Sequence, residues 1–108
     1  MQNILYANPF SLFDYTSGSA NSIRLFLENI KCLGFGVYSI CSCTSYSKSG
    51  FLNTLDISKN NNDGNFLFKG INCKIIKSQE WERRKLTLSE EKVFLKETIL
   101  LMNNIKCF

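Results

Sequence analysis

Histidine is absent from the sequence of 108 residues, and proline occurs only once. Without imidazole the chain cannot supply the general base of a Ser-His-Asp triad or a histidine metal ligand. No apolar run approaches the ~18 residues that cross a bilayer, and Met1-Gln2-Asn3 lacks the positive charge of a signal peptide. These absences exclude imidazole chemistry and predict a cytoplasmic protein.

Cysteine is present in an odd number, five. Cys41-x-Cys43 has the spacing of half a zinc site, but no second ligand pair follows at finger-like spacing. We therefore expect reduced, mostly buried thiols, no bound metal and no other cofactor.

The positive charge is confined to one part of the chain. The net charge is +4, and residues 1–68 contribute nothing to it because four basic and four acidic side chains cancel. The excess lies in residues 69–108, around Arg83-Arg84-Lys85, and Glu80 and Glu82 dilute it. Such short runs usually form a solvated surface, so we expect no nucleic-acid partner. Peripheral contact of residues 69–108 with anionic lipid at the inner membrane face is an alternative.

The length and composition fit one globular domain. Hydrophobic residues make up 44% of the chain and charged residues 20%, which is typical of soluble domains. A chain of this size forms a single domain or a piece of a larger one.

The first forty residues have the pattern of a strand, a helix and a second strand. The spacing predicts a strand over 3–7, ended by Pro9, a helix over 20–33 and a strand over 36–41. Gly34 follows the helix as a left-handed cap. The expected inward face of the helix comprises Ile23, Phe26, Leu27, Ile30 and Leu33. A helix of this length joins parallel strands with a right-handed crossover, which predicts an α/β fold.

The remaining segments complete a small sheet. Residues 42–50 are expected to form a loop, 51–57 a short helical turn or bent connection, and 59–65 a surface loop. Strands over 66–68 and 72–76 are joined at Lys69-Gly70, as in a hairpin.

A last helix is expected from about Leu88 to Ile105. Thr87 and Glu90 match a capping box. The expected apolar stripe comprises Phe94, Leu95, Thr98, Leu101, Met102 and Ile105. Since an alternating α/β fold would continue with another strand, we expect a mostly parallel sheet of two to four strands with an open edge. Another chain covers this edge, or the domain is truncated.

The loop between the first strand and the first helix is the candidate binding site. Ligands of doubly wound folds lie at the carboxyl ends of parallel strands, and a helix N-terminus favours an anion. Gly18 leaves room for a phosphate, and Thr16, Ser17 and Ser19 add hydroxyl groups. The loop matches neither G-x-x-x-x-G-K nor G-x-G-x-x-G. The alternative is a helix entry with serine caps and one flexible glycine.

Residues 4–41, which read I-L-Y-A-N-P-F and later S-G-S-A-N-S-I-R, resemble the opening of family-4-like glycosyltransferases. Residues 78–91 also resemble a later stretch of some members. The resemblance implies an incomplete Rossmann-like, three-layer N-terminal domain of the GT-B fold, spanning residues 1–108 on the acceptor side. It also implies a nucleotide-sugar donor whose diphosphate lies near Ser17, Gly18 and Ser19, with Arg24 in the next helical turn.

The sequence also departs from that family. Phe35 stands where the family usually has histidine, and the domain with the E-x7-E carboxylates is missing. Asp14 is the one carboxylate near the loop, so no catalytic residue can be assigned. We expect a fragment or split half of a glycosyltransferase, acting on a glycan or lipid-linked acceptor and inactive alone. The alternative is a small non-enzymatic α/β interaction module that pairs with itself or a partner through its open sheet edge.

Overall fold

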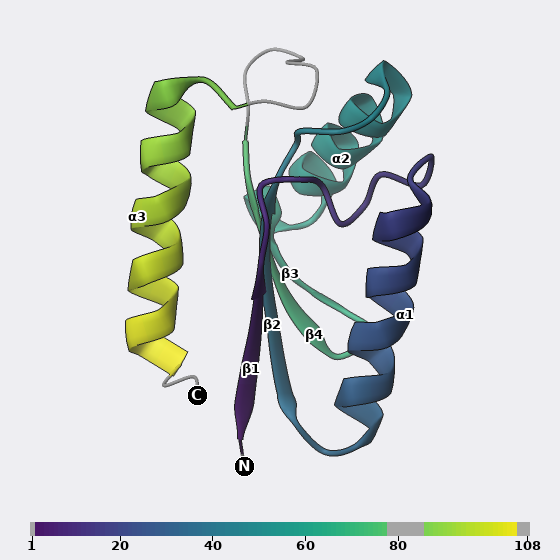
Figure 1. Ribbon diagram of the computed structural model, residues 1–108, viewed down its shortest axis with the longest axis vertical. Helices are drawn as coiled ribbons and strands as arrows, with labels where there is room; N and C mark the ends of the chain where they lie inside the picture. Colours follow the sequence, from purple (N-terminus) through teal and green to yellow (C-terminus); the bar gives the residue numbers. More distant parts are fainter. Residues whose placement is uncertain (1, 78–85, 106–108) are drawn as a thin grey trace.

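A single mixed sheet organises the computed structural model, which describes residues 2–77 and 86–105 (Figure 1). In spatial order it comprises β1 (Asn3–Ala7), β2 (Gly36–Ser42), β4 (Ile71–Ile76) and β3 (Asn65–Phe68). The first three strands are parallel, and β3 is antiparallel to β4. The predicted mostly parallel sheet is therefore confirmed.

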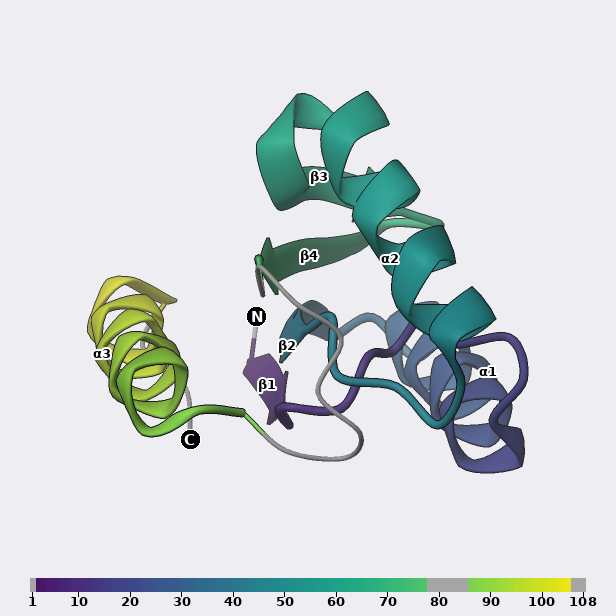
Figure 2. The ribbon, with the colours of Figure 1, turned by 90° about the horizontal axis from the view of Figure 1, so that it is seen from above.

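Helices cover both faces of the sheet. Helices α1 (Gly18–Cys32) and α2 (Lys48–Asn60) lie on one side, and α3 (Leu88–Ile105) lies on the other (Figure 2). This three-layer α/β arrangement is compatible with a partial Rossmann-like domain. None of the helices in the described ranges has the length and apolar character needed to cross a membrane.

The predicted β–α–β unit is present. Helix α1 begins two residues earlier than expected because the Ser17 side chain caps it, accepting a hydrogen bond from the Ala20 amide at 3.2 Å. Gly34 has a φ of +98°, the left-handed conformation expected after the helix. Strands β1 and β2 then pair in parallel, from Asn3 opposite Gly36 to Ala7 opposite Ile40.

Helix α2 corrects the expected loop and short turn over residues 42–57. Ser47 caps the helix by accepting from the Gly50 amide at 3.1 Å. Gly50 packs directly on the Asp14 carboxyl group, leaving no room for a Cβ atom. Thr54 donates to the Gly50 carbonyl at 2.8 Å. The serine-rich segment therefore contains the start of a packed helix and is not only a loop.

The loop after α2 is shorter than predicted because the helix continues to Asn60. A single 3-10 turn, η1 (Asn62–Gly64), leads into β3. The hairpin of β3 and β4 is confirmed, and its turn places Lys69 and Gly70 at positive φ. Arg83-Arg84-Lys85, the centre of the positive charge, lies outside the described residues.

The hydrophobic core lies mainly between the sheet and the α1–α2 layer. Phe13, from the loop after β1, packs against Phe66 and Phe68 with ring centroids 5.5 and 5.4 Å away. The buried cluster around it comprises Leu12, Leu27, Val37, Cys41, Cys43, Phe51, Ile71, Cys73 and Ile75.

Two residues of α1 depart from the expected inward face. Phe26 and Leu33 are 62% and 76% exposed. Leu27 is buried, with Ile23 and Ile30 half-buried beside it. The inward face is thus centred on Leu27, and Phe26 and Leu33 fall on one flank of the helix.

Helix α3 has the predicted bounds and the predicted capping box. The Thr87 amide donates to Glu90 Oε1 at 3.0 Å, and the Glu90 amide donates to Thr87 Oγ1 at 3.3 Å. The inward stripe is narrower than expected. Phe94 is buried and Thr98, Leu101 and Ile105 are half-buried, whereas Leu95 and Met102 are half-exposed.

Candidate functional site

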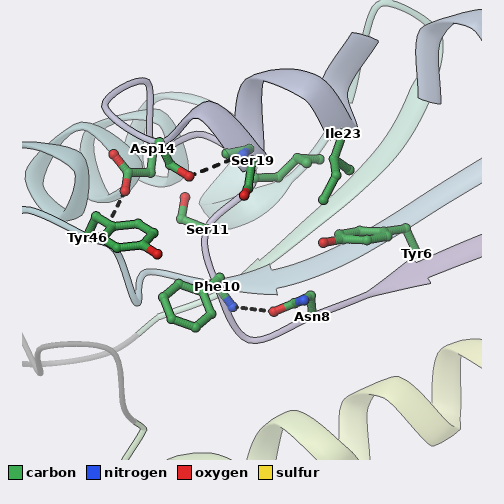
Figure 3. A pocket seen from close by; sticks show the side chains of 11 residues that line it. Tyr6, Asn8, Phe10, Ser11, Asp14, Ser19, Ile23 and Tyr46 are labelled. Carbon is green, nitrogen blue, oxygen red and sulfur yellow. Dashed lines mark hydrogen bonds between the residues drawn. The ribbon is translucent and has the colours of Figure 1, made fainter. Parts of the chain in front are cut away.

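A pocket of about 320 Å³ opens where β1 and β2 end (Figure 3). The loop after β1 runs beside the segment after β2, and the Ser11 amide donates to the Thr44 carbonyl at 2.7 Å. The first turn of α1 closes one side. Tyr6, Asn8, Phe10, Ser11, Leu12, Asp14, Ser17, Ser19, Ala20, Ile23 and Tyr46 line the pocket. The position is the one predicted, at the carboxyl ends of parallel strands.

The Asp14 carboxylate connects the two chain segments that line the pocket. It is 1% exposed, and its Oδ1 accepts from the Thr16 amide at 3.0 Å and from the Thr16 hydroxyl. Its Oδ2 accepts from the Tyr46 amide at 2.8 Å, which joins the two strand-end segments (Figure 3). Both oxygens accept hydrogen bonds that join the two segments, so Asp14 serves as a structural acceptor in this arrangement.

The predicted phosphate-binding residues lie in the first turn of α1. Ser17 is buried, and its hydroxyl is used in the helix cap. Gly18 is exposed, with open space where a Cβ atom would stand. Ser19 is exposed and faces the pocket. The Gly18 and Ser19 amides belong to the helical turn whose N–H groups have no acceptor within the helix. Of these three consecutive residues, Ser17 and Ser19 line the pocket and Gly18 does not.

Arg24 lies behind the loop and does not line the pocket. Its guanidinium donates to the Leu12 carbonyl at 2.5 Å and to the Asn21 side chain, and stacks over the Tyr15 ring at 4.4 Å. Partial burial lowers the pKa of Arg24, but an arginine remains charged at neutral pH. The contacts of Arg24 fix the loop that carries the pocket residues.

Sequence reasoning missed the aromatic side of the pocket. Tyr6 comes from β1, and burial raises the pKa of its phenol. Phe10 and Tyr46 approach each other with ring centroids 6.1 Å apart. The available signal was an aromatic residue shortly after the end of β1, Phe10, and after the end of β2, Tyr46. With these rings and the exposed Ser19 hydroxyl, the pocket suits a ligand that has both polar and flat apolar parts.

The described cysteines supply no reactive thiol near the pocket. Cys41, Cys43 and Cys73 are buried, and Cys32 is exposed. Burial raises the pKa of Cys41 to about 12 and also raises that of Cys73. Thiols held neutral in this way are poor nucleophiles and poor metal ligands.

Comparisons with protein-family models, curated proteins and solved structures found no match to this chain. The class is therefore defined by the structure alone: an α/β domain with a small mixed sheet and a pocket at its parallel strand ends.

Proposed function

We propose that this chain is a fragment or split half of a glycosyltransferase, contributing to the acceptor-side domain. It would act with a nucleotide-sugar donor and transfer the sugar to a glycan or lipid-linked acceptor. The observation that carries the proposal is the pocket at the ends of β1 and β2, bounded by the first turn of α1. The resemblance of residues 4–41 to family-4-like glycosyltransferases supports the same reading.

The proposed contact with the donor is through its diphosphate. The free amides of Gly18 and Ser19 and the Ser19 hydroxyl would bind phosphate oxygens, aided by the positive end of the α1 dipole. Ser17 would hold the helix end in place, and Arg24 would hold the loop. None of the described residues lining the pocket is a lysine or arginine. Because a leaving diphosphate needs several cations for stabilisation, this chain should have no transferase activity alone.

A titration with uridine diphosphate tests the proposed site. We expect binding in the millimolar range, worth about 4 kcal/mol, with amide chemical-shift changes concentrated at residues 17–20. Gly18→Asp should abolish these changes while leaving the fold intact, since an acidic residue suits the first turn of a helix and Gly18 has open space around it.

Ser49→Asp is the matched control for Gly18→Asp. It adds the same charge to the first turn of α2, at an exposed position outside the pocket. Ser49→Asp should bind uridine diphosphate like the unaltered protein. Equal loss in both variants, or shift changes scattered over the surface, would show that no diphosphate site exists at α1.

The second candidate function is an interaction module that pairs through its sheet edge. The observation that favours it is the outer edge of β1, which has no partner strand among the described residues. Size-exclusion chromatography over a range of concentrations tests self-pairing. A defined dimer would support self-pairing, and a monomer at all concentrations would exclude it.

We propose a cytoplasmic site of action, with residues 69–108 available for contact with anionic lipid. The unoxidised thiols of Cys32, Cys41 and Cys73 support a reducing compartment. Co-sedimentation with phosphatidylserine vesicles should fall as salt is raised. Binding that is indifferent to salt, or equal on neutral vesicles, would contradict an electrostatic contact.

A further inference from the structure

Within the described residues, no strand pairs with the outer edge of β1. The Asn8 amide donates to Ile40, and the Gly36 amide donates to Gln2. Because successive residues of a strand point their backbone groups to opposite sides, Asn3, Leu5 and Ala7 direct theirs away from β2. The strand sequence N-I-L-Y-A contains no charge and no proline, which are the usual devices that protect a free edge.

Helix α1 lies on one face of the sheet, in contact with β2 and β4. Its flank toward the β3–β4 hairpin is identified by Glu28, which pairs with Lys69 at 3.3 Å. Its opposite flank includes Ile23, which lies beside Tyr6 of β1 in the pocket. By helical spacing, Phe26 and Leu33 lie on the same flank as Ile23. Both side chains are apolar and exposed.

Helix α3 borders the edge of β1 on the other face. Its flank toward β4 is identified by Glu97, which pairs with Lys74 at 3.0 Å. Its opposite flank includes Leu88, which shares a hollow with Pro9 and Phe10 after β1. The exposed apolar residues at helical spacing on this opposite flank are Leu88, Leu95, Ile99 and Met102.

We use the name edge trough for the outer edge of β1 together with the exposed apolar residues named above on α1 and α3. Figure 2 shows α1 and α3 on opposite sides of the sheet, with β1 as its outermost strand. The strand and the named flank residues carry no charge, and the acidic Glu91 lies beside Leu88 in the same hollow. An anionic lipid, a nucleic acid or an acidic peptide would gain no charge pairing with these residues. An apolar strand would hydrogen-bond to the backbone of β1 and bury the apolar side chains.

We propose that the edge trough binds a β-strand of a partner polypeptide that is apolar on both faces and runs parallel to β1. Its backbone would pair with Asn3, Leu5 and Ala7, and its side chains would alternate between the α1 and α3 flanks. A strand buried on both faces belongs to a parallel sheet, and β1, β2 and β4 are already parallel.

The parallel direction also has a functional consequence. A parallel fifth strand ends beside the loop after β1, so the partner residues that follow it lie next to the pocket. The inference deepens the second candidate function by naming the occupant of the edge, and it does not depend on a diphosphate site.

A soluble strand peptide tests the proposal on the intact protein. The probe has alternating valine and isoleucine between pairs of lysines, and the control peptide has serine on one face in place of the apolar residues. We expect the probe to slow amide hydrogen exchange about tenfold or more at Leu5 and Ala7. Exchange at Ile4 and Tyr6 should change little, because their amides already face β2. The control peptide should have a weaker effect.

A spin label on the probe tests the direction of binding. Placed at the peptide's carboxyl end, it should broaden the signals of Ala7 and Asn8 more than that of Asn3. The reverse pattern would contradict parallel pairing.

Neighbouring residues on each helix provide matched variants for the flanks. Phe26→Lys and Ile99→Lys place a charge in the edge trough and should weaken probe binding about tenfold each. Leu25→Lys and Leu100→Lys alter residues of similar exposure on other faces, 60% and 47% against 62% and 56%, and should leave binding unchanged.

Two results would overturn the proposal. One is probe binding without protection of Leu5 and Ala7, or equal loss in all four lysine variants. The other is slowed amide exchange of Leu5 and Ala7 in the absence of the probe, with an effect that increases with protein concentration. That result would identify a second copy of this chain as the occupant. Uridine diphosphate titrated into the same sample reports on Gly18 separately, so the two proposals fail independently.

Discussion

Asp14 links two segments that lie more than thirty residues apart in the chain. Its carboxylate is the shared acceptor for the Thr16 and Tyr46 amides, and Gly50 of α2 packs against it. A single buried side chain therefore sets the distance between the loop after β1, the segment after β2 and the start of α2.

Removing this carboxylate should destabilise the fold. Asp14→Ala leaves the Thr16 and Tyr46 amides without their acceptor and should lower the free energy of unfolding by about 2 kcal/mol. Urea unfolding followed by circular dichroism measures the change. Asp56→Ala, at an exposed position of α2, should differ from the unaltered protein by less than about 0.5 kcal/mol. Equal stability of the two variants would refute the structural role of Asp14.

Two glycines in helices should respond oppositely to alanine. At Gly50 a Cβ atom meets the Asp14 carboxyl group, so Gly50→Ala should cost about 1–3 kcal/mol through overpacking. At Gly18 the space is open, and Gly18→Ala should stabilise the helix by up to ~1 kcal/mol. Urea unfolding of both variants gives the comparison. A stabilising Gly50→Ala would contradict the close packing of α2 on Asp14.

At the scale of elements, the helix ends explain which parts of the fold the sequence predicts. The capping box of Thr87 and Glu90 and the left-handed Gly34 are local signals, and both are present in the structure. For helix α2 the sequence predicts no more than a short helical turn or bent connection over 51–57, because its early residues are serine-rich and its packing depends on Asp14 and Ser11, which are distant in sequence. Ser11 Oγ lies 2.6 Å from Thr54 Oγ1 inside the fold, and no local pattern encodes that contact.

The same distinction applies to the pocket. Its position, and the grouping of Ser17, Gly18 and Ser19, follow from the order of strand and helix. Tyr46 joins the pocket through contacts with residues distant in sequence, among them its amide bond to Asp14 and its ring contact with Phe10. Arg24 was expected near the donor, yet its contact with the Leu12 carbonyl could not be derived without the path of the loop.

The start of α2 should be sensitive to its missed cap. Ser47→Ala removes the acceptor for the Gly50 amide and should lower the free energy of unfolding by about 1 kcal/mol. Ser22→Ala, the same substitution at an exposed position of α1, is the control and should be nearly neutral. Thermal unfolding distinguishes them. Equal midpoints for the two variants would mean that Ser47 does not cap α2.

At the scale of the whole molecule, burial of titratable groups makes the fold sensitive to alkali. The pKa of Cys41 is raised from 9.0 to about 12, and the pKa values of Cys73 and Tyr6 are also raised, in each case mainly by burial. The folded state therefore favours their neutral forms. The stability they contribute is present below their ordinary pKa values and is lost as the pH rises through the folded ones.

We therefore expect the free energy of unfolding to fall as the pH rises above about 9. Urea unfolding at several pH values measures how steeply the free energy of unfolding falls with pH. Cys41→Val should reduce this slope by up to the contribution of one proton. Alkylation followed by mass spectrometry provides an independent check, because exposed Cys32 should react well before Cys41, Cys43 and Cys73. Early alkylation of Cys41 would contradict its burial.

The unequal burial of the two faces of the sheet has a consequence for the motions of the protein. On α3, Phe94 is the one fully buried apolar side chain among the described residues, whereas the α1–α2 layer shares the main core. Helix α3 should thus detach as a unit while the rest stays folded. Native-state hydrogen exchange in low denaturant should register this as a shared, low opening energy for the α3 amides, well below that of β2 and β4.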